Sequence, residues 1–300
     1  MNVLSLTHPG LELANLLDIK IIERYNEILI KNNQWRMVNI LFFKLTVGFY
    51  FLGTVLFLWF LVSKKETWSR FSIWAPAAGF LTHSLALVIR MVETGSLPVV
   101  TLHESMAFFS WALVLIFLLV EYRYHIQVLG SLILPLAFLS VLSMVVLPAQ
   151  SNHLDAKVQV LWLGIHTTLT VLGTVFFTLA FVVGITYLIQ ERLLKSKRLN
   201  TLYYKLPSLD VLDDLNQRSI YFGFPLLTLG IITGVLLNIF VKDVYFTWDP
   251  KQTLTLVTWL FYLAMLHGRL TVGWRAKKAA VLAVIGFVGV VSTFVGVSHF

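Results

Sequence analysis

Histidines in or beside long apolar segments are the residues of this sequence best suited to chemistry. The chain has eight histidines, and a histidine inside a membrane is costly enough to suggest a function. Imidazole is a common axial ligand of haem iron, and a pair of imidazoles leaves the metal no open position for catalysis. The same side chain can also serve as a hydrogen bond between helices, so each position has to be weighed separately.

A short aromatic loop between two long apolar segments is the second chemical feature. Its side chains combine flat apolar rings with one carboxylate: Tyr245, Phe246, Trp248 and Asp249. If the apolar segments alternate in direction, His166 and His299 fall on the same side of the membrane as this loop. We therefore interpret His166 and His299 as ligands of a haem that lies against the loop.

His83 and His267 form a second candidate pair, inside the apolar segments. At a rise of ~1.5 Å per residue their depths differ by roughly 10 Å, so a shared site requires helix tilt or a shifted helix boundary. For this pair a haem site and a hydrogen bond between helices are both open. His83 could also form a proton relay with Arg90 and Glu93, as in a proton-coupled transporter.

The composition predicts an integral membrane protein. The chain is 58% hydrophobic and 13% charged, whereas a soluble domain has about 45–50% apolar and about 25% charged residues. The net charge of +8 fits basic loops that anchor membrane helices, and no clustered basic face predicts nucleic-acid binding. The absence of cysteine excludes disulfides, thiolate metal ligation and thiol redox chemistry by this chain. A zinc site would need three or four ligands close together, and the sequence groups no such set.

Eight apolar segments predict an all-α polytopic membrane protein, because each is close to the ~20 residues that a spanning helix needs. Residues 1–38 precede them as a tail, with an amphipathic helix expected at about 11–30 and no cleavable signal peptide. Residues 39–300 form the transmembrane domain. The fifth segment is long enough to project beyond the bilayer. The expected spans are about 39–62, 72–91, 105–121, 127–148, 160–190, 220–241, 253–271 and 279–297.

Basic residues predict the orientation of these spans. The loops after the first, third, fifth and seventh spans hold fourteen lysines and arginines. The loops on the opposite side hold three, and the N-terminal tail adds four there, which weakens the difference without reversing it. Since basic loops stay in the cytoplasm, we expect an inner (plasma) membrane protein with both termini and the aromatic loop outside the cytoplasm. In the largest cytoplasmic loop, Ser208 and Asp210 predict the start of one short helix over 206–216. Arg269, near the end of a span, is expected to extend toward the membrane surface.

The aromatic loop and the helix after it resemble the tryptophan-rich (WWD) haem-handling proteins of cytochrome c assembly. The best match in pattern is the polytopic subunit of the system II cytochrome c synthase, over about residues 72–299. This chain departs from the family pattern in having one loop tryptophan, Trp248, and Gln252 in place of a glutamate. The matching stretches are Thr247-Trp248-Asp249-Pro250-Lys251, Thr258-Trp259-Leu260 and Leu266-His267-Gly268-Arg269.

The resemblance implies a route for haem b. In such proteins His267 would receive haem within the membrane, with His83 as its partner, and His166 and His299 would then hold it at the outer face. Two protein partners are implied: a second synthase subunit with a large outer domain, and an apocytochrome c that presents Cys-x-x-Cys-His. The chain would be a subunit of a thioether-forming synthase without a catalytic residue of its own, because the haem vinyls and substrate thiols carry the chemistry. The alternatives are a haem-binding regulator of haem biosynthesis and a proton-coupled transporter.

Overall fold

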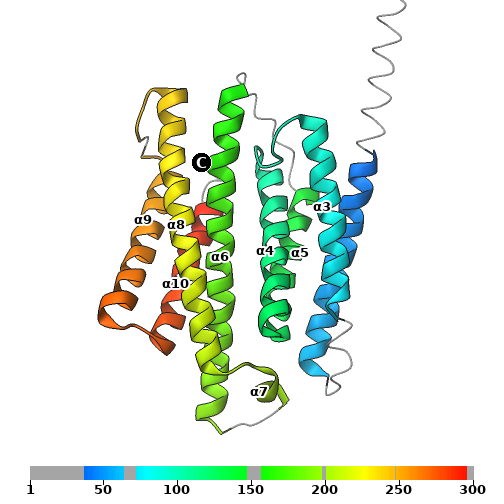
Figure 1. The fold of residues 1–300 in the computed structure, drawn as a ribbon, viewed down its shortest axis with the longest axis vertical. Helices are drawn as coiled ribbons and strands as arrows, with labels where there is room; N and C mark the ends of the chain where they lie inside the picture. The colour runs from blue at the N-terminus through cyan, green and yellow to red at the C-terminus, as the bar shows by residue number, and fades with distance from the viewer. Residues whose placement is uncertain (1–36, 64–71, 147–156, 198–200, 247, 296–300) are drawn as a thin grey trace, which may run out of the picture.

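Long helices run side by side through the computed structural model, which describes residues 37–63, 72–146, 157–197, 201–246 and 248–295 (Figure 1). Within these ranges there is no strand, and the predicted all-α class is confirmed. The long helices are Met37–Val62, α3 (Trp74–Thr94), α4 (Leu102–Tyr124), α5 (Gly130–Val146), α6 (Lys157–Lys195), α8 (Leu209–Lys242), α9 (Pro250–His267) and α10 (Ala276–Val295). Three short elements join them: η1 (Gln127–Leu129), α7 (Thr201–Lys205) and the π-helical turn η2 (Gly268–Val272).

Six of these helices are long and apolar enough to cross a membrane by length and composition. They are the helix Met37–Val62, α3, α4, α6, α8 and α10, and a shorter apolar stretch covers Gln127–Ser143. The chain is therefore a polytopic membrane protein, as predicted. The fifth predicted segment is indeed the longest, because α6 has 39 residues. The predicted amphipathic helix at 11–30 lies outside the described residues.

The bundle has two distinct ends, which we name for use below. The aromatic end holds the loop 243–249 and the first turns of α4, α6 and α9; it is uppermost in Figure 1. The basic end lies opposite and holds α7, η2 and the start of α10 (Figure 1). These two ends correspond to the two loop sets that the sequence separates by charge.

Helix α6 stands at the centre and packs most extensively against α8. Glycines permit this close approach, since a Cβ at Gly173 would lie 2.9 Å from the backbone nitrogen of Leu227. Likewise a Cβ at Gly230 would lie 2.6 Å from Oγ1 of Thr170. Small residues at a helix–helix contact let backbones approach within membranes, where packing rather than the hydrophobic effect holds helices together. The α6–α8 pair therefore forms a rigid support for side chains near its aromatic end.

The prediction of a short helix over 206–216 is wrong about the length of the helix, although its predicted start is confirmed. Ser208 is the N-cap of α8 and accepts a hydrogen bond from the Val211 backbone nitrogen, and Asp210 lies in the first turn. The helix then continues without a break to Lys242, through Pro225. Leu212 and Ile220 are fully buried, so the amphipathic beginning of α8 packs into the core instead of lying on the membrane surface. The separate short helix at this end is α7.

Arg269 also differs from expectation, because its side chain is only 1% exposed and does not extend to the membrane surface. Its Nη1 donates to Asn216 Oδ1 at 3.0 Å, and its Nη2 donates to Asp213 Oδ1 at 2.8 Å. Asp213 and Asn216 are three residues apart on α8 and therefore share one helix face. The same Asp213 oxygen accepts from the Ala276 backbone nitrogen at 3.1 Å. One buried cation thus joins η2, α8 and the start of α10.

Candidate functional site

His166 faces α8 from the aromatic end of α6. Its Nδ1 lies 2.8 Å from the carbonyl oxygen of Gly230. A carbonyl oxygen can only accept a hydrogen bond, so Nδ1 carries the proton and donates it. In the neutral ring the lone pair is then on Nε2. This is the arrangement of metal-binding histidines, in which a hydrogen bond from the second ring nitrogen fixes tautomer and orientation.

Gly234 gives the His166 ring its space on α8. A Cβ at this position would lie 2.7 Å from Cε1 of His166 and 2.9 Å from its Nδ1, closer than packed atoms can approach. Gly230 and Gly234 lie one helix turn apart, so one supplies the accepting carbonyl and the other the room for the ring. The orientation of His166 is therefore built into α8.

Aromatic side chains surround the same end of the α6–α8 pair. Trp162, one turn before His166, lies against Phe240 with ring centroids 5.8 Å apart. In the loop, Tyr245 and Trp248 are 75% and 70% exposed, and Phe246 meets Trp248 edge to face at 4.6 Å. Exposed rings of this size form an apolar surface that a flat ligand could cover.

Asp249 has a structural role in the loop. It is the N-cap of α9, and its Oδ1 accepts a hydrogen bond from the Gln252 backbone nitrogen at 2.8 Å. Pro250 follows in the first helical position, where its missing N–H costs nothing. Trp248, just before the cap, has a φ of +53°, an uncommon backbone region for a tryptophan. The Trp-Asp-Pro sequence thus fixes where the loop ends and α9 begins.

Replacing Asp249 separates its capping role from its charge. We expect Asp249→Ala to destabilise the start of α9 by about 1 kcal/mol, because an orphan backbone N–H loses its acceptor. Asp249→Asn keeps a capping oxygen and should retain the wild-type thermal unfolding midpoint, measured in detergent by circular dichroism. If Asn is as damaging as Ala, the carboxylate charge matters more than the cap.

His83 lies at the contact between α3 and the helix Met37–Val62, fully buried. Its Nδ1 is 3.2 Å from the hydroxyl oxygen of Tyr50, and the ring meets the edges of Phe43 and Tyr50 at 5.7 and 5.8 Å. Its Nε2 has no hydrogen-bond partner among the described residues. The burial and the Tyr50 contact fit the hydrogen-bond interpretation, and Nε2 is the ring nitrogen that remains for a ligand.

The structure does not bring His83 and His267 together. His267 is exposed at the last position of α9, on the opposite flank of the bundle from α3 (Figure 1). Arg90 and Glu93, the other members of the possible relay, pair with each other at 3.6 Å, and Arg90 also pairs with Glu104 at 3.1 Å. The hydrogen-bond contact of His83 is with Tyr50 instead. His299, the predicted partner of His166, lies outside the described residues.

Two residues that shape the His166 site were not singled out from the sequence. Gly230 and Gly234 form a Gly-x-x-x-Gly pattern within an apolar segment. That spacing is a known signal for close helix contact in membranes, and it could have pointed to this face of α8. No comparable signal indicates Tyr50 as the neighbour of His83, because that contact joins two helices.

Comparisons with known proteins place the chain in a family. Residues 99–299 match the family model described as cytochrome C assembly protein. The chain is 32% identical over 237 residues to the cytochrome c biogenesis protein CcsA of Guillardia theta, covering 73% of this chain and 79% of that protein. It is 31% identical over 238 residues to CcsA of Prochlorococcus marinus (strain AS9601), covering 72% and 77%.

A solved structure has a similar fold. The cytochrome c haem lyase CcmF superposes with a TM-score of 0.60 at 16% identity, covering 86% of this chain. The chain spans 46% of the length of that lyase, so this likeness concerns the fold alone. From the family match and the CcsA relatives, the chain belongs to the cytochrome c assembly protein family, and its function is in cytochrome c biogenesis.

Proposed function

We propose that the chain binds haem b at its aromatic end, between His166 and His299, and presents it for covalent attachment to apocytochrome c. The observation that supports this most strongly is the hydrogen bond from Nδ1 of His166 to the Gly230 carbonyl. That bond leaves Nε2 with the lone pair that a haem ligand needs. The family to which the chain belongs favours this function over proton-coupled transport.

The chain's own residues would bind and orient the haem. Tyr245, Phe246 and Trp248 offer the apolar surface for the macrocycle, and the Asp249 cap fixes that surface relative to α9. Lys251, exposed in the first turn of α9, adds a positive charge at the same end of the bundle that would attract a haem propionate. The haem vinyl groups and the cysteine thiols of the apocytochrome supply the thioether chemistry.

Two further histidines extend the proposal into the membrane. His267 is exposed at the basic end of α9, where it would meet haem that arrives from the cytoplasm or the bilayer. For His83 to bind haem, its ring would have to leave the contact with Tyr50. It would then form a membrane site separate from that of His267. Because the two lie on opposite flanks of the bundle, we assign His267 the first role and keep His83 as a separate membrane histidine.

Orientation and partners complete the proposal. The excess of lysine and arginine in the loops of the basic end favours a cytoplasmic position for that end. Both termini and the aromatic loop would then lie outside the cytoplasm, in the inner (plasma) membrane. A second synthase subunit with a large outer domain would complete the synthase around the exposed rings of the loop, and apocytochrome c would deliver Cys-x-x-Cys-His there.

Formation of holocytochrome c tests this function. In a bacterial host that lacks its own cytochrome c assembly proteins, the chain is expressed with the second synthase subunit and an apocytochrome c. We expect wild type to produce haem-stained cytochrome on a denaturing gel, and His166→Ala to reduce it by at least about tenfold through loss of an iron ligand. His125→Asn is the control, because His125 is exposed at the basic end and asparagine tolerates its φ of 54°.

The possible outcomes separate the candidate functions. Wild-type haem staining with His166→Ala would refute the proposed ligand. Haem bound to the purified wild-type chain without any holocytochrome formation would favour the haem-binding regulator. Wild type that never contains haem would overturn the proposed haem site.

A further inference from the structure

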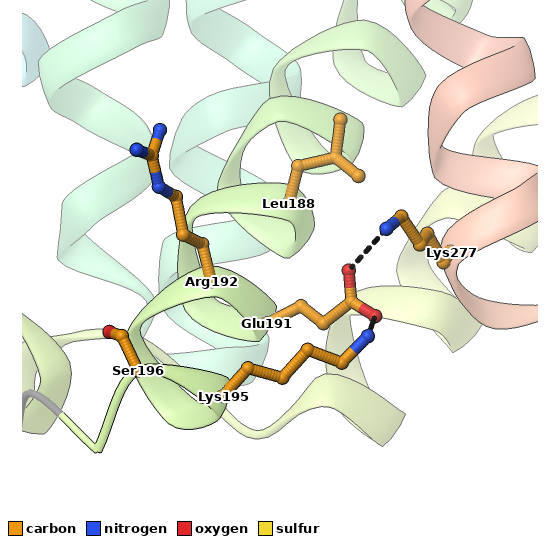
Figure 2. A pocket seen from close by; sticks show the side chains of 6 residues that line it. All are labelled: Leu188, Glu191, Arg192, Lys195, Ser196 and Lys277. Atoms are coloured by element: carbon orange, nitrogen blue, oxygen red, sulfur yellow. Dashed lines mark hydrogen bonds and ion pairs between the residues drawn. The ribbon is translucent and has the colours of Figure 1, made fainter.

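A pocket of about 510 Å³ opens at the basic end, where the last turns of α6 face the first turn of α10 (Figure 2). It lies far from the aromatic loop, at the other end of α6. Three of its lining residues are basic and one is acidic. The lining consists of Leu188, Glu191, Arg192, Lys195, Ser196 and Lys277.

The charges of this pocket are organised by Glu191. Its Oε1 pairs with Lys195 Nζ at 2.6 Å on its own helix, and its Oε2 pairs with Lys277 Nζ at 3.7 Å on α10 (Figure 2). One carboxylate therefore holds the ammonium groups of two helices on the pocket wall. Arg192 adds a third positive charge at the edge of the pocket, where its exposed side chain extends away from Glu191 (Figure 2). The pocket keeps two positive charges that no lining carboxylate balances, which suits a phosphate group.

The pocket lies at the ends of two helices that are long and apolar enough to cross a membrane, α6 and α10. The spanning stretch of α10 begins at Ala276, so Lys277 lies in its first turn. Deeper in the bundle the two helices close against each other, because a Cβ at Gly184 would lie 2.9 Å from the carbonyl oxygen of Ala280. A ligand at Arg192 and Lys277 therefore stays at the level of the helix ends and cannot pass between α6 and α10.

An apolar surface continues from the pocket along α10. Ile285 and Val288 follow Lys277 by eight and eleven residues, and so lie on the same face of the helix. Their side chains are 52% and 64% exposed, which is expected of residues that contact lipid tails. A free phosphate would use only the charges, whereas a phospholipid would use the charges and this surface together.

We propose that this pocket binds the headgroup of an anionic phospholipid, with the phosphate beside Lys195 and Lys277, Arg192 at the edge of the pocket, and the acyl chains along Ile285 and Val288. Basic pockets between membrane helices are a general means of holding anionic headgroups, and each lysine or arginine near the surface contributes to the attraction. Such a lipid would join the end of α6 to the start of α10. The proposal does not depend on haem binding at the opposite end.

Lipid binding to the purified full-length chain tests the proposal. The protein is placed in phosphatidylcholine nanodiscs with increasing fractions of phosphatidylglycerol, and bound phosphatidylglycerol is counted by native mass spectrometry after release. We expect Arg192→Gln/Lys277→Gln to weaken the tightest phosphatidylglycerol site about tenfold to thirtyfold, from the loss of two surface charges. Arg123→Gln/Arg218→Gln is the charge-matched control, because both arginines are exposed at the same end and neither lines the pocket.

The outcomes decide both the site and the source of the phosphate. Selective loss in the pocket variant, with the control unchanged and no competition by millimolar inorganic phosphate, supports a phospholipid site. Equal loss in both variants would show that only net charge matters and would overturn the pocket. Displacement of phosphatidylglycerol by inorganic phosphate would show a free-phosphate site and would overturn the assignment to lipid.

Discussion

Arg269→Met is expected to lower the stability of the chain more than any other single substitution outside the aromatic end. The guanidinium is 1% exposed and bonds to Asp213 and Asn216. Its removal leaves the Asp213 carboxylate, only 21% exposed, without its cation. Breaking a buried ion pair in this way typically costs about 3–5 kcal/mol. Because Asp213 keeps some contact with solvent and its bond from Ala276, we expect about 2–4 kcal/mol here.

Thermal unfolding in detergent, followed by circular dichroism, measures this loss of stability. Thiol-reactive dyes cannot follow the unfolding, because the chain has no cysteine. Arg218→Met is the matched control. Arg218 pairs with Asp214 at 2.8 Å, one position along α8 from Asp213, but the two side chains are 58% and 48% exposed. Exposed pairs of this kind contribute about 0–1 kcal/mol, so its unfolding midpoint should remain near wild type. A similar fall in both variants would contradict the structural role of Arg269.

Gly234→Val is expected to cause the largest loss of haem binding without removing a ligand. A Cβ at this position would lie 2.7 Å from Cε1 of His166, so the ring has to move and its bond to Gly230 has to break. Losing the hydrogen bond that orients a metal ligand usually costs about 10–100-fold in affinity. We expect a loss in that range, measured by titrating haem into the purified protein and following the absorption spectrum.

Gly164→Ala is the matched control for this substitution. Gly164 lies on α6 two residues before His166, and a Cβ there would meet nothing closer than 3.6 Å, from Leu97. It changes the same helix and leaves the ring untouched, so haem affinity should equal that of wild type. Wild-type affinity in Gly234→Val would show that the orientation of His166 on α8 is unimportant for binding.

The fold was largely predictable because its signals are local. An apolar stretch of spanning length identifies a membrane helix in almost any context, and Ser208 correctly indicated the start of α8. The predicted end of that helix was wrong, because α8 continues to Lys242. The short helix was predicted to end at 216 and a separate span to begin at about 220, with polar residues between them, but Asp213 and Asn216 are engaged by Arg269. A cation 53 residues further along the chain satisfies these groups, and no local pattern reveals it.

The candidate site divides in the same way. His166 and the aromatic loop could be selected by residue type and topology, since imidazole and exposed rings have recognisable chemistry. The ring's tautomer could not be predicted, because it depends on which carbonyl of α8 lies opposite it. The comparison of His83 with His267 by their depths in the membrane was also incomplete, because it left out their separation across the bundle. Helix rise estimates depth along the membrane normal, and the separation of α3 and α9 lies across the bundle (Figure 1).

The central claim is that Nε2 of His166 binds haem iron, and chemical rescue tests it most directly. The purified His166→Gly variant, supplied with haem, is compared with wild type by its reduced absorption spectrum, before and after imidazole is added. The account predicts a low-spin b-type spectrum for wild type, its loss in His166→Gly, and its recovery with imidazole, which replaces the missing ring. A His166→Gly spectrum that matches wild type before any imidazole is added would contradict the claim.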